Sequence, residues 1–171
     1  MTKPSTKLLS PVFNEKADAL RLRLRTRLED ANKKLSSLVR TMGVIEPEQF
    51  EAVFNAGYEG LYGGRIHSVI KQHKNIPTRE DLPDRMGIAE LKANLFRIKT
   101  AYKVIAEHRP RGVEEVCAMH RQLGQELREH FKRHNGSYLE TLPPVAHIKQ
   151  VRQRMEKAQK EKTVPAPRRV A

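Results

Sequence analysis

The sequence contains no tryptophan, a single cysteine and few aromatic residues. Aromatic residues make up 5% of its 171 residues, and hydrophobic residues together make up 38%. The lone thiol of Cys117 cannot form an internal disulfide, which excludes a disulfide scaffold and a cysteine-rich zinc fold. No uninterrupted apolar run approaches the roughly 20 residues of a membrane-spanning helix or the apolar core of a signal peptide. We therefore expect a cytoplasmic protein without a membrane partner, built around one mainly aliphatic core.

Acidic residues are scarce at both ends of the chain, and the formal net charge is +13. Residues 1–42 hold ten Lys or Arg against four Asp or Glu, and residues 145–171 hold eight against two. The central residues 43–144 are nearly neutral, with fifteen against fourteen. Clustered cations bind polyanions by releasing counterions, so nucleic acid is the leading partner, ahead of an anionic membrane surface and an acidic protein. A basic surface that merely keeps the protein soluble is the alternative.

Apolar residues recur at intervals of three or four along most of the chain, which is the period of an α-helix. A first helix is predicted to start at Ser10-Pro11 and to end at Gly43. Further helices are expected at 46–57, 65–73, 88–108 and 113–135, and from Pro143 onward. No segment keeps the two-residue period of a strand. The predicted fold is therefore all-α, a compact multi-helix domain with a long N-terminal amphipathic helix and a basic C-terminal helix and tail.

The expected organisation is a flexible N-terminus over residues 1–9, a single helical domain over 10–161 and a disordered basic tail over 162–171. The first helix would be about 48 Å long at about 1.5 Å per residue. A compact chain of this size has a radius of gyration of only about 15.5 Å. The helix is therefore expected to bend, to project, or to pair with a second copy in a homodimer.

Side chains that could hold a metal ion or act as a nucleophile are poorly placed. Four residues have the spacing of zinc ligands: Cys117, His120, His130 and His134. They fall in one predicted helix, which would separate Cys117 from His130 by about 20 Å, whereas zinc ligands converge on one ion. No Gly-x-Ser-x-Gly turn is present, and acidic residues at 80–84 suit the dipole of a nearby helix start. We expect no catalytic residue, no metal and no cofactor, and thus a protein that is not an enzyme.

The candidate contacts to nucleic acid are cations on the first and last predicted helices, together with one arginine beside a glycine-rich segment. Four arginines fall within seven residues of the first helix with no acid among them, and guanidinium groups suit phosphates. The candidates are Arg21, Arg23, Arg25, Arg27, Arg65, Lys149, Arg152, Arg154 and Lys157.

The segment from Gly57 to Arg65, GYEGLYGGR, is the most distinctive motif. One interpretation is that its backbone amides and Arg65 receive a phosphate or carboxylate, although it lacks the Lys-Ser/Thr of a P-loop. The other is that the glycines allow tight turns and close packing while Tyr58 and Tyr62 fill the core. We favour the second, because aromatic volume is scarce in this sequence.

Three segments, 15–64, 84–105 and 120–144, resemble in this order the C-terminal half of the DNA-damage-inducible protein D (DinD) family. The resemblance rests on NAGYEGLYGG and on MG-x-x-EL-x-ANLFR. Within these motifs, Leu91, Leu95 and Phe96 are expected in the core by their spacing. The candidates for motif or partner contacts are Tyr58, Gly60, Tyr62, Gly63, Gly64, Asn94 and Arg97.

The resemblance implies an association with the SOS response and with inhibition of RecA recombinase filaments on single-stranded DNA. It also implies an N-terminal BRO-type DNA-binding domain, as in phage antirepressors, and this sequence is expected to be the C-terminal half without that domain. We predict a non-enzymatic accessory protein that binds single-stranded DNA, the RecA filament or both, and modulates recombination. The alternative is a regulator from a phage or mobile element, of antirepressor type, that acts by protein–protein contact.

Overall fold

The computed structural model describes residues 14–163, which form α-helices, two short 3₁₀ helices and no strand. The α-helices are α1 (Glu15–Arg40), α2 (Pro47–Leu61), α3 (His67–His73), α4 (Ile88–His108), α5 (Gly112–Asn135) and α6 (Ile148–Thr163). The 3₁₀ helices are η1 (Leu82–Arg85) and η2 (Leu139–Thr141). The predicted all-α fold is confirmed over the described residues.

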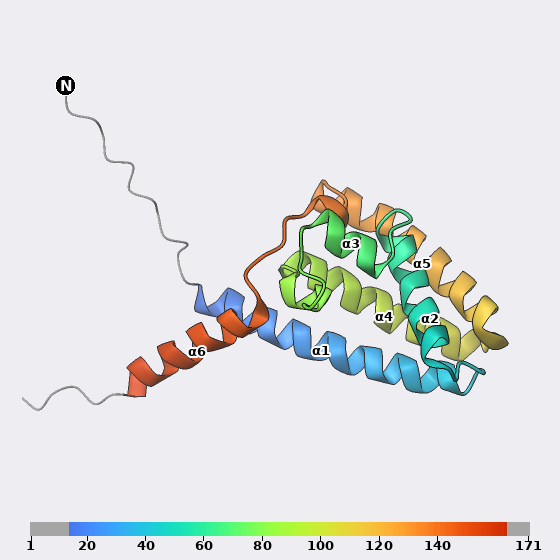
Figure 1. The fold of residues 1–171 in the computed structure, drawn as a ribbon, viewed down its shortest axis with the longest axis horizontal. Helices are drawn as coiled ribbons and strands as arrows, with labels where there is room; N and C mark the ends of the chain where they lie inside the picture. Colours follow the sequence, from blue (N-terminus) through green and yellow to red (C-terminus); the bar gives the residue numbers. More distant parts are fainter. Residues whose placement is uncertain (1–13, 164–171) are drawn as a thin grey trace, which may run out of the picture.

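The helices form two packed pairs, α1 with α4 and α2 with α5, which are joined by contacts between α4 and α5 (Figure 1). α6 lies against the N-terminal part of α1 and projects away from the other helices (Figure 1). The apolar stripe of α1 is buried within the chain: Leu24, Leu28, Ala31, Leu35 and Val39. This packing buries the apolar stripe of the long helix within one chain, and the homodimer stays a prediction.

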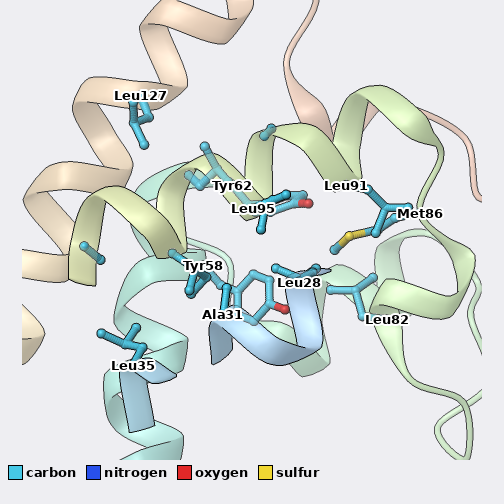
Figure 2. Packing of buried hydrophobic residues seen from close by; sticks show 14 of the residues in the cluster. Leu28, Ala31, Leu35, Tyr58, Tyr62, Leu82, Met86, Leu91, Leu95 and Leu127 are labelled. Atoms are coloured by element: carbon cyan, nitrogen blue, oxygen red, sulfur yellow. The ribbon is translucent and has the colours of Figure 1, made fainter. Parts of the chain in front are cut away.

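Aliphatic side chains make up most of the core, and two tyrosines of α2 fill the space between the helices (Figure 2). Tyr58 and Tyr62 are both buried among leucines of α1 and α4. The interpretation of these tyrosines as core volume is therefore confirmed. Val69, on the short helix α3, is 42% exposed and does not contribute to this core.

The limits of α4 and α5 agree with the prediction, whereas α1 and α6 begin later than predicted. α1 starts at Glu15 because Asn14 is extended and its side chain accepts a hydrogen bond from the amide of Ala17 (3.1 Å). Ser10 and Pro11, the predicted start, lie outside the described residues, as do 1–9 and 164–171. α6 starts at Ile148 because the amide of Val145 donates to the carbonyl of Arg85 (2.9 Å), which holds the preceding segment against η1.

α2 continues through Gly57, where the sequence analysis placed its end, and stops only at Leu61. The turn that follows spans residues 62–64 and includes two glycines with positive φ angles, Gly63 at 63° and Gly64 at 87°. Most of the glycine- and tyrosine-rich motif is therefore helical, and this places its side chains and small residues against α4 and α5.

Candidate nucleic-acid interface

The four arginines of α1 do not form one cluster. Successive helical residues are about 100° apart. Arg21 and Arg25 consequently lie on one side of the apolar stripe, and Arg23 and Arg27 lie on the other. The two pairs have different environments, and only one pair is available to a ligand.

Arg21 and Arg25 are used inside the molecule. The Arg21 side chain is buried, and its Nε and Nη2 atoms donate to the carbonyls of Met86 (2.9 Å) and Asp84 (2.8 Å). Burial lowers the pKa of Arg21. Arg25 Nε donates to Oδ1 of Asp84 at 2.7 Å, with Glu29 also nearby. Each of these arginines holds α1 against the segment around η1, which argues against the predicted contact with nucleic acid.

Arg23 and Arg27 are exposed, one helical turn apart, and face away from η1. Among residues 14–163, no carboxylate oxygen lies within 4.0 Å of either guanidinium. Lys34 continues the same helix face two turns further on. This side of α1 therefore presents cations that the rest of the described chain does not neutralise.

α6 carries six cations and two glutamates, and its cations fall into a paired and an unpaired group. Arg154 pairs with Asp18 of α1 at 3.0 Å, and Lys162 pairs with Glu15 at 2.8 Å. The remaining four are exposed and have no carboxylate within 4.0 Å in the described part of the chain: Lys149, Arg152, Lys157 and Lys160. These four residues, which we term the α6 quartet, form a free cationic surface, whereas Arg154 fastens α6 to α1.

Arg65 does not complete an empty anion site. Its Nη1 atom donates to the carbonyl of Tyr62 (3.1 Å) and lies 3.5 Å from Oε1 of Glu140. Glu140 also accepts two hydrogen bonds from Arg128, at 2.6 and 2.7 Å. Although burial acts to raise it, these hydrogen bonds bring the pKa of Glu140 below its usual value. A carboxylate of the chain thus already occupies the place of the anion that the sequence analysis considered.

The family motifs meet in a buried polar chain that begins at Glu90. Glu90 Oε1 accepts hydrogen bonds from Tyr62 Oη and Lys74 Nζ, both at 2.8 Å. Asn94 Nδ2 donates to Tyr62 Oη at 2.8 Å, and Lys74 donates further to the carbonyls of Leu139 and Leu142. Burial is the largest influence on the carboxyl group and raises the pKa of Glu90. These polar groups join the C-terminal ends of α2 and α3 to the N-terminal part of α4.

The buried polar chain continues through Arg97, which is 1% exposed. Arg97 Nη2 donates to Asn94 Oδ1 (3.2 Å), and the guanidinium lies 4.8 Å from the centre of the Tyr58 ring. Its Nη1 atom lies 2.8 Å from His120 Nε2, and His120 Nδ1 lies 2.8 Å from the carbonyl of Val53. Because a guanidinium can only donate, Nε2 accepts and Nδ1 carries the proton.

Two glycines of the motif leave room for this chain and for α5. A Cβ atom at Gly57 would overlap Arg97 Nη1 and the ring of His120. A Cβ atom at Gly60 would overlap the carbonyl oxygen of Arg121 and lie 2.8 Å from Gly124 Cα. α2 and α5 can therefore cross at backbone contact only where both helices lack side chains.

The motif residues are mainly structural. Five of those predicted to contact a partner are buried and offer it no surface: Tyr58, Gly60, Tyr62, Asn94 and Arg97. Gly63 and Gly64 are exposed, and their positive φ angles account for the choice of glycine at the turn. The burial of these five residues argues against the predicted partner contact.

The structure adds a groove of about 600 Å³ between α1 and α4 that the sequence analysis did not single out. Its lining residues are Arg27, Asp30, Ala31, Lys34, Phe96, Ile98, Lys99, Thr100, Tyr102 and Lys103. Phe96 was expected in the core, but its side chain is 51% exposed. The sequence contained a signal for this exposure. Phe96 follows Leu95 directly and is turned about 100° from it around the helix, which places it outside the Leu91–Leu95–Ile98 stripe.

Neither a metal site nor a membrane span is found in the described residues. Between residues 14 and 163, no three side chains of His, Cys, Asp or Glu come together closely enough to hold a metal ion. No helix in the same range has the length and apolar character needed to cross a bilayer. Of the four residues with zinc-ligand spacing, all lie on α5, and His120 is committed to Arg97 and Val53.

The comparison with known protein families follows the same motifs. The profile of the DinD C-terminal domain matches residues 15–151. The chain belongs to the DinD family. A curated DinD relative, DNA damage-inducible protein D of Escherichia coli (strain K12), is 33% identical over 135 residues, which are 78% of this chain and 49% of the relative. The chain thus spans about half the length of this relative, and the predicted resemblance to the C-terminal part of DinD proteins is confirmed.

The limits of the DinD match coincide with features of the fold. The match begins at Glu15, the first residue of α1, and includes every residue of the buried polar chain. It ends at Val151, the last fully buried residue of α6. Most of the α6 quartet therefore lies beyond the part of this chain that the DinD profile describes.

Proposed function

We propose that this DinD-family chain is a non-enzymatic accessory protein of the DNA damage (SOS) response. It acts in the cytoplasm, binds single-stranded DNA together with a RecA-type recombinase filament formed on it, and modulates recombination. The observation that carries this proposal is the α6 quartet, which is exposed on a projecting helix and has no carboxylate partner among residues 14–163.

The contrast between paired and unpaired cations supports a ligand rather than simple solubility. Guanidinium groups that are partly buried in this molecule are matched with carboxylates, as in Arg25 with Asp84, Arg85 with Glu80 and Arg128 with Glu140. The cations of the quartet have no carboxylate partner within the described residues, and a phosphate backbone would neutralise them while releasing its counterions. The DNA-damage link of the family adds the DNA context.

The test is fluorescence anisotropy of a labelled 20-nucleotide oligo(dT) and of a duplex of equal length, over a series of salt concentrations. We expect the wild-type chain to bind oligo(dT) with micromolar or better affinity that falls steeply with salt. The quadruple substitution Lys149→Gln, Arg152→Gln, Lys157→Gln and Lys160→Gln should weaken binding. It should also flatten the slope of log affinity against log salt by about 0.7 for each phosphate that the variant no longer neutralises.

A matched control removes the same net charge from other exposed positions: Lys92→Gln, Arg109→Gln, Arg111→Gln and Arg133→Gln. If both quadruple variants lose affinity equally, only the total charge matters and the interface assignment fails. If the folded wild-type chain does not bind oligo(dT) at low salt, the proposal is wrong and the antirepressor-type alternative is favoured.

An assay of RecA-catalysed strand exchange tests the proposed binding to the recombinase filament. Addition of the chain should inhibit strand exchange, and an unaffected reaction would remove the recombinase from the proposal.

A further inference from the structure

The groove between α1 and α4 combines exposed aromatic rings with cations. Phe96 and Tyr102 are 51% and 41% exposed, and no other aromatic side chain among residues 14–163 is comparably open to solvent. Both rings line the same groove, although they stand almost two helical turns apart on α4. In a chain with so few aromatic residues, two of them are thus kept out of the core at one place.

The Phe96 ring packs against a second aromatic ring. Its centroid is 6.3 Å from that of Phe131 on α5, and the two rings are nearly perpendicular at 89°. This edge contact braces one side of the ring and leaves the rest of it open to solvent. A braced, exposed ring is a platform for another flat apolar group.

The charges around the rings favour an anionic ligand. The groove walls carry Arg27 and Lys34 from α1 and Lys99 and Lys103 from α4, against the single carboxylate of Asp30. None of these four cations has a carboxylate within 4.0 Å in the described part of the chain. Arg23, one turn before Arg27 on the same face of α1, extends the cationic wall toward the N-terminal part of the helix.

We propose that this groove binds single-stranded DNA, with bases stacked on Phe96 and Tyr102 and with phosphates held by Arg27, Lys34, Lys99 and Lys103. Rings flanked by cations are the arrangement by which proteins bind single strands without reading their sequence. A duplex is a poorer fit, because its base faces are already covered by their neighbours. The inference rests on the proposed function and assigns it a second site, apart from the α6 quartet.

The absence of tryptophan allows a direct test of stacking. In the variant Phe96→Trp, the introduced indole is the only tryptophan, so its fluorescence reports on the groove alone. Addition of 20-nucleotide oligo(dT) should quench this fluorescence in parallel with the anisotropy change of the labelled strand. The control Val69→Trp places an indole at a comparably exposed position on α3, outside the groove, and should show no quenching. Unchanged indole fluorescence of the Phe96→Trp variant at saturating DNA would overturn the inference.

Substitutions separate stacking from charge. Phe96→Ala and Tyr102→Ala should each weaken oligo(dT) binding by about tenfold to a hundredfold with little change in the salt slope, and should spare duplex binding. The double variant Lys99→Gln with Lys103→Gln should flatten the slope, whereas Lys92→Gln, on α4 but outside the groove, should change it less. Circular dichroism and thermal unfolding establish that each variant is folded.

The two proposals fail in different ways. If the quadruple α6 variant loses binding while both alanine variants bind like the wild type, the groove assignment is wrong and the proposed function stands. If the alanine variants lose binding while the α6 variant does not, the groove is the principal site and the quartet is not. If the wild-type chain does not bind oligo(dT), both proposals fall.

Discussion

Arg97 shows how a single buried residue can escape prediction from the sequence. Asn94 and Arg97 are polar, and the sequence offered them only as candidates for motif or partner contacts. α4 is buried on most of its circumference, because α1 packs on one side of it and α5 on another. The sequence pattern identifies an apolar face, but it cannot distinguish an exposed polar residue from one that is buried against a third helix. The hydrogen bonds from Asn94, Arg97 and His120 are therefore a finding of the structure.

His120 should make the fold sensitive to acid. Burial is the main cause that lowers the pKa of His120 from 6.5 to about 3, with the Arg97 charge adding to it. Between these pH values the unfolded chain binds a proton at this residue and the folded chain does not, so stability falls as the pH drops below about 6.5. Within this window, His120 lowers the free energy of unfolding by up to about 1.4 kcal/mol for each unit by which the pH falls. Urea unfolding at pH 7, 6, 5 and 4 measures it.

The substitution His120→Gln isolates this effect, because glutamine can still donate and accept a hydrogen bond but does not titrate. We expect the variant to be less stable than the wild type at pH 7 and to lose less stability between pH 6 and pH 4. His108→Gln, at the exposed end of α4, serves as the control and should retain the wild-type dependence. Equal pH dependence in the wild type and His120→Gln would contradict the assignment.

At the scale of elements, the crossing of α2 and α5 explains why glycines stand inside two helices. Glycine in a helix interior costs about 0.5–1 kcal/mol relative to alanine. Here Gly60 and Gly124 face each other, and a Cβ atom at Gly124 would lie 2.8 Å from both the Gly57 oxygen and the Leu61 nitrogen. The close approach of two backbones offsets the intrinsic cost. A glycine is also typical of a helix end. The sequence analysis therefore ended this helix at Gly57, four residues before its end at Leu61.

Gly60→Ala should therefore destabilise the protein even though alanine is the better helix former. The added methyl group would meet the backbone of Arg121 and Gly124, which can move only by separating the helices. We expect a loss of about 1–3 kcal/mol in the free energy of unfolding, as for other overpacked sites. Ala52→Gly, at an exposed position of α2, measures the effect of helix propensity alone. It should lower the free energy of unfolding by about 1 kcal/mol. A stabilised Gly60→Ala protein would show that α2 and α5 are not in backbone contact.

At the scale of the whole molecule, the distribution of charge along the sequence did not reveal which cations are paired within the fold. The cations of the two chain ends were visible in the sequence, but the internal use of Arg21, Arg25 and Arg154 was not. Their carboxyl and carbonyl partners are up to 136 residues away along the chain, so no local pattern contains them. The groove, likewise, exists only because α1 and α4 are packed together. Helix period and helix limits are local properties and were largely predicted, whereas the pairing of charges is a tertiary property.

The contacts of α6 predict that its C-terminal part opens independently of the other helices. Ile148 and Val151 are buried, but beyond them the helix is held mainly by two surface ion pairs to α1. Such pairs contribute about 0.2–1 kcal/mol each, so residues 154–163 should open without unfolding the rest of the molecule. Hydrogen–deuterium exchange should be faster in these residues than in α4.

Binding of 20-nucleotide oligo(dT) should slow exchange in residues 154–163, because phosphates held by Lys157 and Lys160 would favour the ordered helix. The double variant Glu15→Gln with Asp18→Asn should accelerate exchange in α6 without affecting α5, since it removes only the two surface pairs. Exchange in α6 as slow as in α4 without DNA would show that the helix is part of the rigid fold. Unchanged exchange in α6 after DNA binding would show that α6 does not contact the DNA, and the groove would be the remaining candidate site.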